Sequence, residues 1–275
     1  MDAVPDAAAC NEAVKLAQKK GFATLKSFVN GVLRSVARNK DAIAYPDLSV
    51  KYSTPEWIVN LWTGQLGEEK TIAVLEGLLA EHPVTVRLRD KSVKEALQEA
   101  LAARGGSMKG HPYLENAYKI EKTDDMTTLP LYQNGAFVVQ DVSSMLAVRA
   151  VLSEDFLAEK RTAGEKLCIV DVCAAPGGKS MLAADLLSDA GVDRIGFQIE
   201  ARDISGKKVM QTAENFARCG FDKDSVSAVV CDALECDEQQ TADIVIADVP
   251  CSGLGVIGKK RDIKYKITQE QLTEL

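Results

Sequence analysis

The sequence predicts an α/β protein whose C-terminal half is a Rossmann-like, mainly parallel sheet with helices on both faces. Three observations carry this prediction. Strand and helix patterns alternate from residue 167 onward, a glycine-rich loop follows the first of these strands, and acidic residues follow the later ones. Because ligands bind such sheets at the carboxyl ends of the strands, where the strand order reverses, we expect one crevice there.

The composition is that of an ordinary globular protein, with 275 residues, 46% hydrophobic residues and a net charge of −7. No stretch is long and apolar enough for a membrane span, and the first residues lack the features of a signal peptide. The seven cysteines show no Cys-x-x-Cys spacing and the two histidines are isolated. We therefore expect no disulfide framework, no metal site and no membrane, and a reducing, cytoplasmic location.

The sequence pattern of the first part of the chain predicts helices followed by a small α+β module. Residues 11–39 have the pattern of two helices interrupted at Gly21, too short for a core of their own, and Thr54 is expected to cap the next helix. A strand at 82–90 would place Arg87 and Arg89 on an open face, followed by a helix at 92–103 and a weaker strand at 113–120. The predicted division is therefore 1–45, 46–130 and 131–275, the second of these containing an RRM-like module.

Two stretches are strongly basic. One runs from Ala13 to Lys40 and contains no acidic residue, and the other contains Lys259, Lys260, Arg261 and Lys264. Either stretch could follow a phosphate backbone, or be a solvated helix face and an exposed loop, respectively.

The alternating region predicts strands at 167–172, 194–200, 226–231 and 243–248, and helices at 178–188 and 205–218. The first strand leads into a loop that combines small residues, two glycines and a lysine. We interpret this loop as the cofactor-binding loop, formed by Cys173, Ala174, Ala175, Pro176, Gly177, Gly178 and Lys179.

The same loop is close to the phosphate-binding loop of an NTPase, Gly-x-x-x-x-Gly-Lys-Ser/Thr. Cys173 stands where the first glycine is needed, and Pro176 removes one N–H from the cradle. Glycines at 177 and 178 are expected to let the backbone approach a ligand. A P-loop NTPase therefore remains a competing interpretation.

Acidic residues at the next strand ends favour a different cofactor. Asp203 is placed to accept hydrogen bonds from ribose hydroxyls, and Asp232 from an exocyclic amine. An acidic pocket suits the positive sulfonium of S-adenosylmethionine and repels ATP. The alternatives are that Asp203 caps a helix and that Asp232 is a turn residue.

These motifs together resemble the RNA cytosine-5 methyltransferases of the Sun/RsmB type. The resemblance rests on residues 171–179, 203–204, 232–233 and 248–255, with 135–144 and 262–265 matching further segments of the bacterial 16S ribosomal RNA enzyme. Residues 11–39 resemble the last helices of its NusB-like N-terminal domain. The implied fold is a Rossmann-like S-adenosylmethionine-dependent methyltransferase domain, preceded by a small α+β module and the end of a NusB-like domain.

The resemblance implies methyl transfer from S-adenosylmethionine to cytosine C5 in RNA, most consistently 16S ribosomal RNA. A cysteine thiolate adds to C6 of a flipped-out base, which makes C5 nucleophilic. By resemblance, Cys251 would assist product release, and Asp248 would orient the cytosine and line the cofactor site. Residues 173–179, Asp203 and Asp232 would also bind the cofactor.

The sequence departs from the family because the nucleophile belongs to a later Thr-Cys motif, and no Thr-Cys pair occurs in this chain. We therefore expect a fragment lacking both ends, with strand 243–248 left as an exposed edge. Cys251 could substitute as nucleophile, or the chain could be a non-catalytic remnant that binds RNA or cofactor.

Overall fold

A computed structural model of the chain describes residues 4–42, 44–80, 83–122, 125–163, 166–192, 196–235 and 242–274. The chain divides into two compact units, each described below by itself. The first unit combines Met1–Ala80 with Leu254–Glu274, and the second contains Glu81–Gly253. The predicted boundaries at residues 45 and 130 remain predictions.

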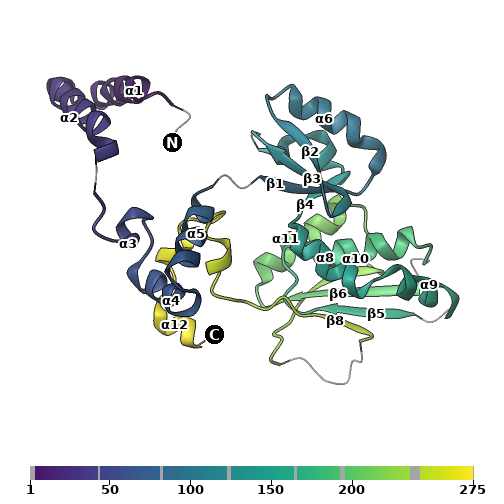
Figure 1. Cartoon of the computed structure of the whole chain (residues 1–275). Coiled ribbons are helices and arrows are strands. Elements are labelled where there is room, and N and C mark those ends of the chain that lie inside the picture. Colours follow the sequence, from purple (N-terminus) through teal and green to yellow (C-terminus); the bar gives the residue numbers. More distant parts are fainter. Residues whose placement is uncertain are drawn as a thin grey trace. The chain divides into compact units, whose positions relative to one another are not determined.

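The first unit is helical (Figure 1). Its elements are α1 (Asp6–Lys19), η1 (Ala23–Leu25), α2 (Lys26–Asn39), η2 (Lys40–Ala42), α3 (Leu48–Lys51), α4 (Glu56–Leu66), α5 (Glu68–Leu79), η6 (Leu254–Val256), η7 (Ile263–Tyr265) and α12 (Gln269–Glu274). The two predicted N-terminal helices are present, separated around Gly21. The apolar stripe of α2 is exposed, with Phe28 at 68% and Val36 at 55%.

Residues 254–274 return to the first unit and complete its core. Leu254 and Ile257 cluster with the fully buried Ile58 of α4, and the hydroxyl of Tyr265 donates to the Ser53 carbonyl at 2.7 Å. The predicted cap of α4 is wrong, because Thr54 donates its hydroxyl to the Tyr52 carbonyl and makes no bond to the helix.

The second unit begins with a small antiparallel sheet whose strand order is β2-β3-β1-β4. Its elements are β1 (Val84–Leu88), η3 (Lys91–Val93), α6 (Lys94–Ala102), β2 (Ser107–His111), β3 (Leu114–Glu121), η4 (Met126–Thr128), α7 (Pro130–Gln133) and β4 (Phe137–Val139). Apolar side chains of β1 pack against Leu97 and Leu101 of α6, which explains the alternating pattern of that strand.

Arg87 does not lie on an open face, as the alternation predicted, but is 1% exposed. β1 is an inner strand with β3 and β4 as neighbours, and its second face meets the next layer of the unit. Arg87 Nη1 donates to Asp185 Oδ2 at 2.6 Å, and Arg89 Nη2 donates to Asp185 Oδ1 at 2.8 Å. The alternating pattern correctly predicted which side chains of β1 share a face, but both faces of the strand are covered by other elements of the unit.

The larger sheet is parallel and has the strand order β7-β6-β5-β8. Its elements are α8 (Val142–Val151), α9 (Glu154–Ala163), β5 (Leu167–Asp171), α10 (Gly178–Asp189), β6 (Phe197–Asp203), α11 (Gly206–Arg218), β7 (Val226–Val230) and β8 (Ile244–Ile246). Each predicted strand and helix of this region is present within a few residues, which confirms the α/β prediction.

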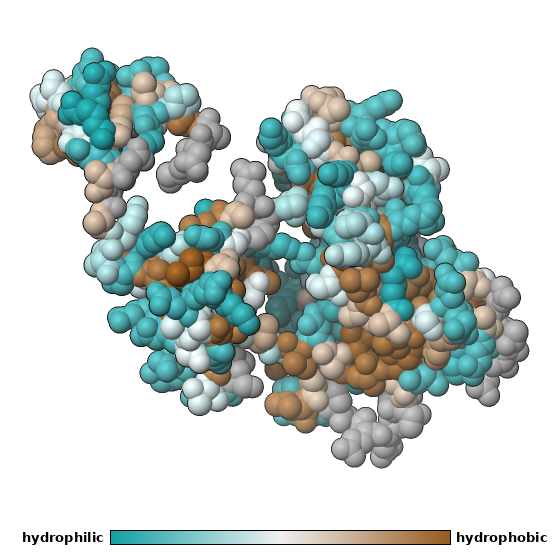
Figure 2. All heavy atoms as spheres, in the orientation of Figure 1, coloured by the Kyte–Doolittle hydropathy of each residue, from teal (hydrophilic) through white to brown (hydrophobic). Residues whose placement is uncertain are grey.

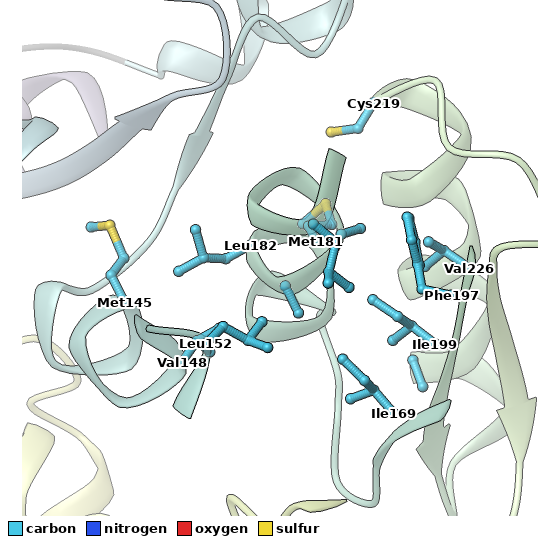
Figure 3. Close-up of a cluster of buried hydrophobic side chains, with 14 of the residues drawn as sticks. Met145, Val148, Leu152, Ile169, Met181, Leu182, Phe197, Ile199, Cys219 and Val226 are labelled. Carbon is cyan, nitrogen blue, oxygen red and sulfur yellow. The ribbon is translucent and has the colours of Figure 1, made fainter. Parts of the chain in front are cut away.

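The core of this unit lies between the parallel sheet and the helices on it. Figure 3 shows Met181 of α10 on the side of strand residues such as Phe197 and Ile199, and Leu182 on the side of Met145 of α8. β8 forms one edge of the parallel sheet, where it pairs with β5 alone among the described strands, and its Val245 is 60% exposed. The prediction of an exposed apolar edge is confirmed, and hydrophobic area is visible on this unit in Figure 2.

We expect Asp185→Asn to destabilise the second unit by about 3–5 kcal/mol, because it leaves the charge of buried Arg87 uncompensated. Urea unfolding followed by circular dichroism would measure the loss. Glu115→Gln is the matched control, since its ion pair with Lys91 is exposed. Equal unfolding midpoints for the two variants would contradict the central role of Asp185.

Candidate functional site

The candidate site lies where the strand order of the parallel sheet reverses, at the carboxyl ends of β5 and its neighbours. The loop after β5 is hydrogen-bonded to the strands on both sides of β5, namely β8 and β6. Val172 N donates to Ile246 O of β8 at 3.0 Å, and Ala174 N donates to Arg202 O of β6 at 2.8 Å. The predicted cofactor loop therefore stands at the switch point, as the strand pattern required.

Gly177 is required by packing on α11. Its φ is +92°, and a Cβ at this position would lie 2.7 Å from Phe216 and 2.9 Å from Thr212. At Gly178, which begins α10, a Cβ would meet nothing closer than 3.5 Å. The absence of a side chain at Gly177 thus lets the loop approach α11, whereas the sequence had suggested approach to a ligand.

Asp171, the last residue of β5, is buried at the base of the loop. Its Oδ2 accepts a hydrogen bond from the Ser180 hydroxyl at 2.8 Å. Burial raises the pKa of Asp171 to about 6, with the charge of Asp248 adding to the rise, while Ser180 and Lys179 oppose it. Sequence reasoning assigned Asp171 no separate role, although a carboxylate ending an apolar strand is the signal that could have identified it.

Lys179 forms an ion pair with Asp248, which follows β8. This contact joins the two motifs that the sequence placed about seventy residues apart. Two amides of the loop are also engaged: Ala174 N bonds to β6, and Gly177 N donates to Ala174 O at 2.7 Å. Because Pro176 has no N–H, three of the seven loop residues offer no free amide to a phosphate, which disfavours a P-loop cradle.

Asp203 and Asp232 follow β6 and β7, as predicted. Each uses one oxygen locally: Asp203 Oδ1 accepts from Ser205 N at 3.0 Å, and Asp232 Oδ1 accepts from Leu234 N at 3.0 Å. Asp203 Oδ2 also lies 3.4 Å from the Lys208 ammonium. The turn role foreseen for Asp232 is therefore present, whereas Asp203 stabilises the turn before α11 and does not cap the helix, whose N-cap residue is Ser205. These bonds orient the two carboxylates at neighbouring strand ends.

The two cysteines of the motifs have different surroundings. Burial, together with the charges of Asp203 and Asp171, raises the pKa of the Cys173 thiol, so this thiol stays protonated near neutral pH. Cys251 lies in the segment after β8 and is exposed. The geometry therefore disfavours Cys173 as a nucleophile and leaves Cys251 accessible.

The basic segment after Gly258 belongs to the first unit. Lys259, Lys260 and Arg261 are exposed, so their predicted contact with RNA is sterically open. Lys264 is different, because it is 8% exposed and burial lowers its pKa. The prediction that Lys264 contacts RNA is corrected, since Lys264 packs within its own unit.

Gln140 was missed as a candidate residue. It follows β4, is 6% exposed, accepts from Arg87 Nε at 3.0 Å and donates to the Gly178 carbonyl at 2.9 Å. Gln140 therefore links the small sheet to the start of α10, directly behind the cofactor loop. Its place between an apolar strand and Asp141 was visible in the sequence, but its two partners lie far away in the chain.

An apolar hollow of about 270 Å³ lies beside β8. Lys179 and Asp248 line it together with apolar residues of β5, β8, α8 and α10. Among the described residues no helix is long and apolar enough to cross a membrane. In the same part of the chain, no three His, Cys, Asp or Glu side chains gather closely enough to hold a metal ion.

Comparison with known proteins gives two family matches. Residues 160–275 match the family described as 16S rRNA methyltransferase RsmB/F, and residues 1–38 match the NusB family. The probable ribosomal RNA small subunit methyltransferase B of Bacillus subtilis (strain 168) is 34% identical over 275 residues. That alignment covers 96% of this chain and 57% of the relative, so the chain spans little more than half of the relative's length.

Two solved structures share the fold. NSun6 from Pyrococcus horikoshii with SFG has a TM-score of 0.63 at 18% identity, covering 80% of this chain and 76% of that one. A methyltransferase homologue from the same organism has a TM-score of 0.55 at 22% identity, covering 82% and 70%. The family matches thus confirm the resemblance to the Sun/RsmB-type RNA methyltransferases, and the two solved structures support the Rossmann-like fold.

We expect Gly177→Ala to destabilise the protein by about 1–3 kcal/mol, because the new methyl group overlaps Phe216 and the backbone has a positive φ. Gly178→Ala is the matched control and should unfold at nearly the wild-type midpoint. Thermal unfolding of the three proteins provides the measurement. Similar losses at both positions would show that packing on α11 does not set the requirement for glycine.

The raised pKa of Asp171 predicts a pH-dependent stability. Its protonated form is favoured in the folded state, so this contribution is full near pH 4 and is lost as the pH rises through about 6. The free energy of unfolding of wild type, measured relative to that of Asp171→Asn, should therefore fall by about 2–4 kcal/mol as the pH rises from about 4 to above 6. Urea unfolding across this pH range measures the difference in stability between the two proteins, and a pH-independent difference would refute the prediction.

Ser180→Ala should move this loss of stability to higher pH, because it removes a hydrogen bond that lowers the pKa of Asp171.

Proposed function

We propose that the protein transfers a methyl group from S-adenosylmethionine to C5 of a cytosine in RNA of the small ribosomal subunit. The observation that carries the proposal is the arrangement of four neighbouring parallel strands, each with a carboxylate at or just after its carboxyl end, beside the loop that follows β5. The family match over residues 160–275 supports the reaction class. The B. subtilis relative, which bears the name of a small-subunit methyltransferase, supports the class of RNA.

The cofactor is proposed to bind over the loop from Cys173 to Lys179. Asp203 accepts from the ribose hydroxyls and Asp232 from the adenine amine, because local hydrogen bonds from Ser205 N and Leu234 N orient the two carboxylates at neighbouring strand ends. When bound, S-adenosylmethionine supplies an electrophilic methyl group on a sulfonium. Negative carboxylates at these strand ends favour that positive charge, whereas the triphosphate of ATP would be repelled.

The target cytosine is proposed to lie near Asp248 and Cys251. Lys179 holds Asp248 through their ion pair, which positions the carboxylate for hydrogen bonds to the ring or its amine. The accessible thiol of Cys251 assists release of the methylated base. The attacking thiolate is assigned to a Thr-Cys motif, and no such pair occurs in residues 1–275. We place the RNA backbone along Lys259, Lys260 and Arg261.

Two other functions are weighed against this one. A non-catalytic protein that binds RNA and cofactor would keep the crevice and the basic segment but transfer no methyl group. A P-loop NTPase is disfavoured, because Lys179 is paired with Asp248, the amides of Ala174 and Gly177 are already bonded, and Pro176 has no N–H.

The test of the reaction uses the gene product read through to its stop codon, small-subunit RNA tritiated at cytosine C5, and S-adenosylmethionine. One tritium released for each methyl group incorporated is the expected result, because C5 exchanges its hydrogen for the methyl group. Methylation without tritium release would exclude C5 as the target atom. Binding of cofactor and RNA without any transfer would favour the non-catalytic alternative.

Calorimetric titration of the present chain separates the ligands. S-adenosylhomocysteine should bind, and Asp203→Ala should weaken it at least about tenfold through loss of a charge-assisted acceptor. Asp222→Ala, a turn carboxylate after α11, is the control. Magnesium ATP should not bind, and ATP binding in place of S-adenosylhomocysteine would revive the NTPase interpretation.

A further inference from the structure

A second pocket, lined mainly by charged and polar side chains, lies against α10. It has a volume of about 390 Å³ and is formed where β1 and β3 of the small sheet meet α8 and α10. We name it the guanidinium pocket. Its polar lining consists of Arg87, Arg89, Lys91, Asn116, Arg149, Asp185 and Asp189.

The guanidinium pocket contains buried polar atoms without partners. Among the described residues five buried side-chain atoms lack a hydrogen bond, and three belong to this pocket: Arg87 Nη2, Asn116 Oδ1 and Arg149 Nε. Arg87 is 1% exposed, so its Nη2 has little access to bulk water. Buried donors without partners are costly, and their gathering around one cavity indicates an occupant that accepts hydrogen bonds.

The charge of the pocket points to an anion. Four cationic side chains and two carboxylates line it. Asp185 is already engaged, because its oxygens accept from Arg87 Nη1 and from Arg89 Nε and Nη2. Lys91 is exposed and paired with Glu115, so the positive charge inside the pocket comes from its three arginines, and the 1% exposure of Arg87 strengthens the local field.

We propose that the guanidinium pocket binds a phosphate group. Arg87 Nη2 and Arg149 Nε donate to its oxygens, since guanidinium groups match the geometry of phosphate. Asn116 Oδ1 needs a donor, because its amide nitrogen is directed to the Leu88 carbonyl at 3.3 Å. A phosphate hydroxyl or a neighbouring sugar hydroxyl supplies that donor.

The phosphate has two possible sources, which share this chemistry. It belongs either to the backbone of the RNA or to a free phosphate anion. The first source rests on the proposed function, whereas binding of phosphate itself does not. Because β1 also reaches the cofactor loop through Gln140, an occupied pocket would hold Arg87 in the conformation that supports Gly178.

Titration of the whole chain with inorganic phosphate, followed by calorimetry in a phosphate-free buffer, tests the proposal. Arg149→Met is the informative variant, because the described residues give Arg149 no hydrogen bond or ion pair whose loss would unfold the protein. It should weaken phosphate binding at least about tenfold, and Arg149→Lys should restore part of it. Lys109→Met, on the far strand β2, is the control and should bind like wild type.

The proposal is overturned if wild type does not bind phosphate up to about 20 mM, since water alone would then fill the pocket. It is also overturned if Arg149→Met binds phosphate as well as wild type does, since the anion would then bind elsewhere.

Competition with a short single-stranded RNA identifies the source of the phosphate. If RNA displaces phosphate and Arg149→Met reduces the salt dependence of RNA binding by about one ion, the backbone is the source. If RNA does not compete, the ligand is a free phosphate anion. A failed methyl transfer assay would leave the phosphate titration unaffected, so the two failures are distinguishable.

Discussion

The second unit depends on one carboxylate, Asp185, which is shared by Arg87 of β1 and by Arg89, the residue directly after that strand. Both arginines bond to Asp185 of α10. Arg89 also donates to the carbonyls of Gly135 and Cys219 and stacks over the Phe221 ring at 4.5 Å. A single strand of the small sheet thereby fixes α10 and the end of α11 with respect to itself.

This arrangement explains why the small sheet supports the cofactor loop. Burial lowers the pKa of Arg87, and the adjacent Asp185 carboxylate opposes that shift, so the guanidinium remains charged inside the unit. Its remaining polar contact passes through Gln140 to the Gly178 carbonyl. Because isolated loops of this length are mobile, a buried hydrogen-bonded connection to a second sheet limits the positions that the start of α10 can adopt.

The sequence predicted the parallel sheet well because each of its strands and helices carries its own periodicity. It also predicted the loop and the acidic strand ends, since topology alone brings the carboxyl ends of parallel strands together. The errors concern residues whose environment is set by distant contacts. Period-two alternation at Arg87 gives the side of the strand but not what covers it, and Lys264 looks like any other lysine of a basic run. Gly177 is glycine because of Phe216, a residue thirty-nine positions later.

Carboxylates lie at one end of helix α10 and arginines contact its other end, and the polarity of the helix explains how both are tolerated. The carboxylates of Asp171 and Asp248 lie at its N-terminal end, where the helix dipole favours negative charge. Arg87 and Arg89 contact its second half, where positive charge is favoured. The cofactor crevice therefore can remain acidic enough for a sulfonium without destabilising the helix. The guanidinium pocket can likewise keep unpaired donors, because Asp185 and the helix end offset part of their charge.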